Sequence, residues 1–147
     1  MRFEFSRHHD GAAASSFDLG DLRLVLDSAD VSSASHRPSR SMMIYLAIVH
    51  LVDGLSELAE GHSSRFRFVG PDSSFSLDFR RKNDVLTVTA GNALVGAVPM
   101  SDALTALLAG TTTFLTDPDN ALAASESVVE DLEAAVRRLR GVVGSSR

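Results

Sequence analysis

Two short segments near the beginning of the chain alternate between apolar and polar residues. Phe3 and Phe5 alternate with charged or hydroxyl-bearing neighbours, which is the period of a half-buried β-strand. A second alternating segment covers residues 17–27, but its apolar positions shift phase at Gly20–Asp21. We therefore predict two strands, and we expect a β-bulge at the phase shift to return both apolar sets to one face.

The longest apolar run covers residues 42–52, in which only His50 is strongly polar. The run ends at Asp53, after about half of the ~20 apolar residues that a membrane span needs, so we predict a core helix and no membrane partner. At about 100° per residue, one side of this helix stays apolar to its end. The residues of this apolar stripe are Ile44, Ile48, Leu51, Leu55 and Leu58.

The first half of this helix is apolar on all sides, so it needs cover on two sides. We expect a sheet beneath the helix and the last helix of the chain above it, which would make it the centre of the core. The alternative is that its remaining apolar side chains stay exposed and form a docking surface for another protein. These side chains are Met42, Met43, Leu46 and Val49.

Four short strand-like runs follow between residues 65 and 99, and their spacing is typical of an antiparallel meander. Two helices are predicted after the meander. The first begins at Ser101 and ends at Gly110, and the second runs from Asp117 to about Arg140. The conformation of Thr111–Thr116 stays open, because threonine favours strands whereas the neighbouring segments are helical.

The predicted order of elements is two strands, a helix, four strands and two helices. This order indicates an α+β fold, with one antiparallel sheet of about six strands and the helices packed on one of its faces. A chain of 147 residues is long enough for a single core. We assign residues 1–140 to one compact domain and residues 141–147 to a frayed C-terminal tail.

Composition narrows the classes of function. The chain is 44% hydrophobic and 22% charged, which is typical of a soluble globular protein, and it has no cysteine. Its net charge of −5 disfavours nucleic acid as a partner. Arginine greatly outnumbers lysine, and alanine, valine and glycine are plentiful, which suggests a bacterium with an actinobacterial-like genome. Glu4 interrupts what would be the apolar part of a signal peptide, so we predict a cytoplasmic protein.

Two groups of residues are candidates for a pocket or a metal site. His50, Asp53 and Glu57 share one side of the long helix, and His8 and His9 lie together in the first loop. Three ligands on one helix rarely converge on one ion, and adjacent histidines point in different directions. No nucleophile, nucleotide or zinc motif is present in the sequence. We therefore assign no catalytic residue, no metal and no cofactor, and lean against an enzyme.

Charge placement is the remaining signal. Four aspartates cluster around the second strand and are opposed in sequence by Arg23; they are Asp18, Asp21, Asp27 and Asp30. A basic group on the meander consists of Arg65, Arg67, Arg80, Arg81 and Lys82. Such groups can be ordinary solvated faces, or they can steer a partner of opposite charge.

These features predict a small intracellular protein-binding domain, such as an immunity-type inhibitor that occludes a basic partner through an acidic surface. On this hypothesis the four aspartates form the rim of the interface, and apolar side chains beside them anchor it. One alternative is an enzyme or small-molecule-binding protein with a pocket between sheet and helices. Another is an oligomeric subunit that self-associates through the long helix or a sheet edge.

Overall fold

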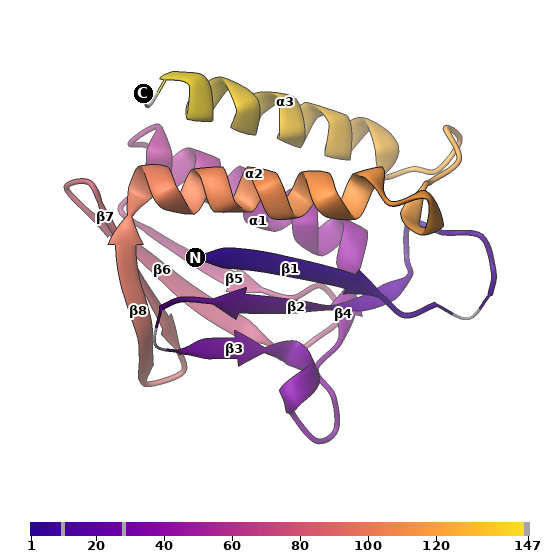
Figure 1. The fold of residues 1–147 in the computed structure, drawn as a ribbon, viewed down its shortest axis with the longest axis horizontal. Helices are drawn as coiled ribbons and strands as arrows, with labels where there is room; N and C mark the ends of the chain where they lie inside the picture. The colour runs from indigo at the N-terminus through magenta and orange to yellow at the C-terminus, as the bar shows by residue number, and fades with distance from the viewer. Residues whose placement is uncertain (10, 28, 146–147) are drawn as a thin grey trace.

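The computed structural model describes residues 1–9, 11–27 and 29–145 (Figure 1). Within these residues the chain forms eight strands in two antiparallel sheets, three α-helices and two short 3-10 helices. The helices pack on the sheets, so the predicted α+β class with antiparallel strands is confirmed. The strands divide between two sheets of four, rather than forming one sheet of about six. Alternation predicts where strands lie, but it does not predict which strands pair.

The first sheet is organised around β2 (Leu19–Val25). β2 pairs with β1 (Arg2–Arg7), and also with the short strands β3 (Asp30–Ser32) and β4 (Met42–Met43). The sequence did not predict β3 or β4, because their residues lie in or beside a polar, serine-rich segment.

The predicted β-bulge at Gly20–Asp21 is wrong. The register between β1 and β2 is continuous, from the pair Arg2 and Val25 to the pair Arg7 and Gly20. Leu22 and Leu24 face the core and are fully buried, whereas the apolar residues before the phase shift remain exposed. The phase shift therefore marks two apolar side chains that the core does not use, Phe17 and Leu19.

The second sheet is the predicted meander, with strand order β5-β6-β7-β8. Its strands are β5 (Arg65–Val69), β6 (Ser76–Lys82), β7 (Val85–Ala90) and β8 (Ala93–Pro99). The turn between β7 and β8 contains Gly91 at a φ of 60°, a conformation that glycine adopts without strain. This sheet does contain a register shift, between Val88 and Thr89.

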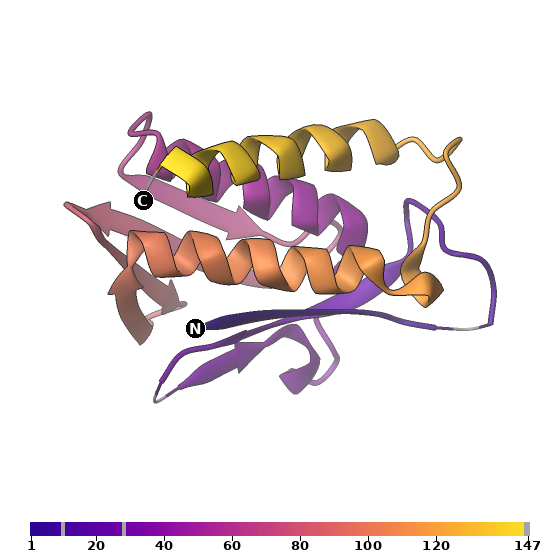
Figure 2. The ribbon, with the colours of Figure 1, turned by 45° about the horizontal axis from the view of Figure 1, so that its top comes forward.

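Helix α1 (Ile44–Ala59) is the centre of the core, as predicted. It contacts α3 on one side and β5 and β2 on the other (Figures 1 and 2). Every residue of its apolar stripe is fully buried. Met42 is also fully buried, which contradicts the alternative of an exposed docking surface at that residue.

Helix α2 (Met100–Thr116) is longer than predicted, because it continues through Gly110 and includes all of Thr111–Thr116. Gly110 is needed for packing rather than for ending the helix. A Cβ atom at this position would collide with the carbonyl oxygen of Phe3 in β1. The helix thus lies closely along β1 (Figure 1) and covers that edge of the first sheet.

Helix α3 (Val129–Ser145) begins later and ends later than predicted. The cap signal at Asp117 initiates only the 3-10 helix η2 (Pro118–Asn120), in which the Asp117 carboxylate accepts a hydrogen bond from the N–H of Asp119. At the other end, residues 141–145 are helical and Val143 is buried, so the predicted helix end at Arg140 is wrong. The rest of the predicted tail, 146–147, lies outside the described residues.

None of the described helices combines the length and apolar character needed to cross a membrane.

Candidate functional site

The outer face of the first sheet is polar and exposed. Alternation along β1 and β2 places Glu4, Asp21 and Arg23 on the face opposite the buried leucines. Arg23 forms ion pairs with Glu4 and with Asp30, each at 3.0 Å. The hydrogen bonds to Asp30 and then to Glu4 raise the pKa of Arg23. The carboxylate of Asp30, a predicted rim residue, is therefore exposed but paired.

Asp21 is the centre of a hydrogen-bonded cluster on this face. One carboxylate oxygen accepts from the hydroxyls of Ser33 (2.7 Å) and Ser41 (3.0 Å), and the other lies 2.8 Å from Nε2 of His8. Burial raises the pKa of Asp21, but the hydrogen bonds from Ser33, His8 and Ser41 outweigh burial and hold it below its ordinary value. The carboxylate is therefore ionised at neutral pH.

This cluster contains serine, histidine and aspartate, but it does not have the geometry of a catalytic triad. Ser41 and Asp21 both approach the same ring nitrogen of His8, at 3.2 and 2.8 Å. In a triad the acid and the nucleophile bind opposite nitrogens, so that a proton can pass through the ring. The cluster instead ties the loop that follows β3 to β2, and it holds Asp21 in place.

The turn before β2 presents an exposed aromatic side chain. Phe17 is 61% exposed and Leu19, two residues later, is 42% exposed. Hydrogen bonds hold the turn: the Asp18 carboxylate accepts from the backbone N–H of Ser15 at 2.9 Å, and the buried Ser16 hydroxyl donates to Glu126 at 2.9 Å. Phe17 is therefore held outward by a turn that is fixed at both of its flanking residues.

Asp18 has a structural role that the sequence did not reveal. Its carboxylate lies 3.1 Å from the guanidinium of Arg7, whose side chain is only 2% exposed. Arg7 also donates to the backbone oxygen of Asp119 at 2.6 Å. Asp27, by contrast, is exposed at the far end of β2. The four predicted rim aspartates thus occupy different environments rather than one patch.

The predicted group on α1 is dispersed among separate contacts. His50 packs against the rings of Phe66 and Phe68, with centroids 5.3 and 5.7 Å away. Asp53 lies 4.0 Å from Arg138 of α3. Burial raises the pKa of Asp53, and Arg138 partly opposes that effect. Glu57 is exposed on the same helix.

The two histidines of the first loop are also separated from the α1 group. His8 bonds to Asp21, whereas the Nδ1 atom of His9 accepts from the backbone N–H of Gly11 at 3.2 Å. In the described part of the chain, no three histidine, aspartate or glutamate side chains are close enough together to hold a metal ion.

The five members of the basic group on the meander do not share one role. Arg65, Arg67, Arg80 and Lys82 are exposed on the second sheet. Arg81 instead donates to the backbone oxygens of Leu58 and Ala59, at 2.8 and 2.7 Å, at the C-terminal end of α1. A cation at this end of a helix stabilises it. Arg81 is therefore a helix cap.

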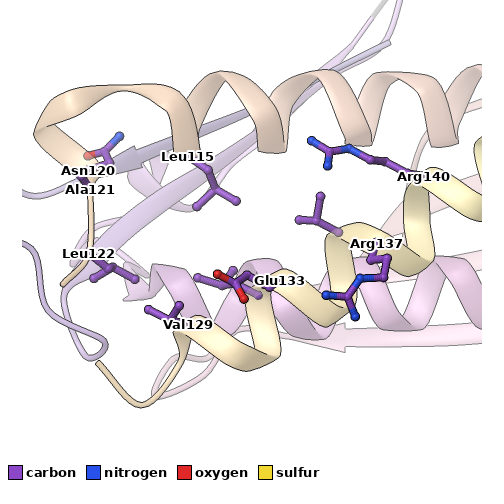
Figure 3. Close-up of a pocket in the computed structure, with 10 residues that line it drawn as sticks. Leu115, Asn120, Ala121, Leu122, Val129, Glu133, Arg137 and Arg140 are labelled. Atoms are coloured by element: carbon purple, nitrogen blue, oxygen red, sulfur yellow. The ribbon is translucent and has the colours of Figure 1, made fainter. Parts of the chain in front are cut away.

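The structure also contains a cleft that the sequence analysis did not predict. It lies between the C-terminal part of α2, η2 and α3, and has a volume of about 470 Å³ (Figure 3). Its apolar lining consists of Leu115, Leu122, Val129, Leu132 and Val136, together with Ala121. Its polar lining consists of Asn120, Glu133, Arg137 and Arg140. No sequence pattern could have revealed it, because its walls come from segments that meet only in the folded chain.

Comparisons with known protein families, curated proteins and solved structures find no match for this chain. Its function must therefore be inferred from its own surfaces. Two of them stand out: the rigid apolar turn beside the acidic face of the first sheet, and the cleft between α2 and α3.

Proposed function

We propose that this chain is a small, cytoplasmic, bacterial protein-binding domain, and more specifically an inhibitor of the immunity type that occludes a basic partner. The acidic outer face of the first sheet would meet the partner, with Phe17 and Leu19 as apolar anchors beside it. The observation that carries the proposal is Phe17, an aromatic side chain that is 61% exposed on a rigid turn.

An exposed, pre-positioned aromatic side chain is well suited to binding a protein. Aromatic residues dominate the small set of interface positions that supply most of the binding energy. A side chain on a rigid turn also loses less conformational entropy on binding than one on a mobile loop. The hydrogen bonds of Ser16 and Asp18 supply that rigidity. Leu19 extends the apolar area towards the outer face of the sheet.

The charges of the first sheet favour a basic partner; Asp21 is the carboxylate nearest the anchor, and Asp27 and Asp30 lie at the far end of β2. The outer face and its adjoining turn carry four carboxylates against two arginines, Arg2 and Arg23, while the segment after β3 carries the exposed Arg37 and Arg40. The carboxylates are those of Glu4, Asp21, Asp27 and Asp30. Asp21 is ionised at neutral pH, and Asp27 is exposed. Such an excess of one charge increases the rate of encounter with a partner of opposite charge.

The experiment that tests this proposal is site-specific photo-crosslinking in the bacterium of origin. Phe17 is replaced by the photoreactive analogue p-benzoylphenylalanine, and crosslinked products are identified by mass spectrometry. The matched control carries the same analogue at Leu94, which is 66% exposed on β8 of the second sheet. We expect position 17, but not position 94, to crosslink predominantly to one basic protein.

A result in which both positions give the same products, or in which position 17 gives none, would contradict the proposal. Crosslinks from position 17 to a second copy of the chain would instead favour the alternative of an oligomeric subunit. Circular dichroism of both variants establishes that each is folded, so that a negative result can be interpreted.

A further inference from the structure

We propose that the cleft between α2 and α3 binds a small amphipathic anion, with its apolar body on the floor of the cleft and its anionic group at Arg140. The ligand class is that of a medium-chain carboxylate. This site is separate from the outer face of the first sheet, so the inference does not depend on the proposed function.

The floor of the cleft supplies the apolar part of the site. Leu132 and Val136 of α3 are buried at its base, while Leu115, Leu122 and Val129 are only half-buried. Leu115 and Leu122 also pack on the core, and all three side chains still expose apolar surface that lines the cleft. A ligand that covers them removes this surface from water, which is favourable in proportion to the apolar area buried.

Two arginines supply the charged part. Arg140 extends across the cleft towards α2, whereas Arg137, three residues earlier on the same helix, turns its guanidinium away from α2 and towards the side of Glu133 (Figure 3). Side chains at this spacing are neighbours, about 5–6 Å apart at Cβ. Neither guanidinium has a carboxylate partner within 4 Å among the described residues, although Glu133 lies one turn before Arg137. Arg140 is therefore placed to bind an anionic ligand in the cleft, and Arg137 adds positive charge nearby; Arg is well suited to bind a carboxylate.

The end wall of the cleft is preformed, because hydrogen bonds within the chain hold Asn120 in place. The backbone oxygen of Asn120 accepts from the buried Tyr45 hydroxyl at 2.6 Å, and the Asn120 side chain donates to Phe114 at 3.1 Å. Burial raises the pKa of Tyr45 to about 12, so its hydroxyl keeps the proton that it donates. A largely preformed cleft of 300–1,000 Å³ is typical of small-molecule sites.

Glu133 limits the charge that the ligand can carry. Its carboxylate lines the cleft beside the apolar floor, in the direction of Val129 (Figure 3). A second anionic group at that end of a ligand would be repelled. The site therefore favours an anion with its charge at one end and an apolar body at the other.

The test is a charge series with one chain length: decanoate, 1-decanol and decyltrimethylammonium. Binding is measured by chemical-shift changes in ¹H–¹⁵N NMR spectra of the full chain, below the solubility limit of 1-decanol and below the critical micelle concentrations of the two ionic probes. We expect saturable one-to-one binding of decanoate, with shifts at Leu115, Leu122 and Val136. We expect 1-decanol to bind about tenfold more weakly and the cation more weakly still.

Variants connect this binding to the cleft. R137Q/R140Q should weaken decanoate binding about tenfold or more, with R140Q giving the larger single effect. The matched control R67Q/R80Q removes two exposed arginines of the second sheet, and should leave the affinity unchanged. A121W places a ring in the cleft from an exposed position and should also weaken binding.

Equal affinity for decanoate and 1-decanol, or equal losses in R137Q/R140Q and R67Q/R80Q, would overturn the inference. Shifts that map to another surface would do the same. Concentration-dependent shifts of the cleft residues without any probe would show that a second copy of the chain occupies the cleft, and would also overturn it.

Discussion

Arg7 is a charged side chain inside the fold, and its environment explains what Asp18 does. The guanidinium is 2% exposed and is balanced by the carboxylate of Asp18. It also lies 3.4 Å from the side-chain oxygen of Asn120 and donates to the backbone of Asp119. One buried cation therefore joins β1, the turn before β2 and η2. The same turn presents Phe17, so the stability of this network and the geometry of the proposed anchor are coupled.

We expect D18N to destabilise the protein by about 2–3 kcal/mol, because it leaves a buried guanidinium without its counter-charge. The matched control is D30N, which breaks a pair with the exposed Arg23 and should cost less than about 1 kcal/mol. Urea unfolding followed by circular dichroism measures both. Equal losses would contradict the structural role of Asp18.

The pKa values of two other aspartates are shifted in opposite directions, so their ionised forms should have opposite effects on the free energy of unfolding. The pKa of Asp21 is lowered in the folded state, so its stabilising contribution is present at neutral pH and is lost as pH falls through that pKa. D21N should therefore cost about 1 kcal/mol at pH 7, and the difference from the unsubstituted protein should shrink towards pH 3.

The pKa of Asp53 is raised, so its ionised form is disfavoured in the fold, and D53N should lose no stability at pH 7. Urea unfolding of both variants between pH 3 and pH 7 measures these free-energy differences. A D21N loss that grows towards pH 3, or a D53N loss at pH 7, would contradict the prediction.

The sequence could not have separated these aspartates by role. Asp18, Asp21 and Asp30 lie within one short stretch, and only the folded chain shows that one balances a buried arginine, one centres a serine and histidine cluster, and one pairs on the surface. Their partners come from the β1 region, from β2 and from the segment between β3 and β4. The positions of the charges along the sequence do not show which of these contacts each aspartate makes.

At the scale of elements, α2 depends on a contact that its own sequence disfavours. Glycine in the middle of a helix is less favourable than alanine by about 1 kcal/mol, yet Gly110 occupies that position. The reason is the carbonyl oxygen of Phe3, which lies where the Cβ of any other residue would have to be. Close packing of α2 along β1 outweighs helix propensity at this residue.

We therefore expect G110A to destabilise the protein by roughly 2 kcal/mol or more, because α2 must move away from β1. The control is G141A in α3, where nothing lies within 4 Å of the added Cβ; it should stabilise the protein by about 0.5–1 kcal/mol. Thermal unfolding compares the two. A gain of stability in G110A would show that α2 and β1 are not in close contact.

Helices and strands with a continuous apolar period could be predicted from the sequence. The start of α3, which was predicted from a capping residue, and the short strands β3 and β4, which form by pairing with β2, could not. The stripe from Ile44 to Leu58 correctly predicts α1 and its buried position. Asp117 is a true capping signal, but the helix that it initiates is only one turn long. The alternation around Phe17 and Leu19 wrongly predicts that they belong to the core, because alternation alone does not distinguish a bulged strand from a surface anchor.

At the scale of the whole molecule, the outward faces of the two sheets carry opposite charge. The first sheet presents an excess of carboxylates, and the second presents four exposed basic side chains with Asp78 paired to Arg65. Although the net charge of the chain is −5, its charges are therefore unevenly distributed between the two sheets. A basic partner would be oriented towards the first sheet, where the proposed anchor, Phe17, lies.

This polarity leads to a kinetic prediction for the partner captured at position 17. D21N/D27N/D30N should slow association at low salt by about tenfold and flatten its dependence on ionic strength, while the dissociation rate changes little. The control D84N/D102N/D131N makes the same change of net charge on exposed positions outside the first sheet. Stopped-flow or surface-plasmon measurements at several salt concentrations separate the two variants. If both slow association equally, net charge alone governs the encounter, and the outer face of the first sheet is not where the partner arrives.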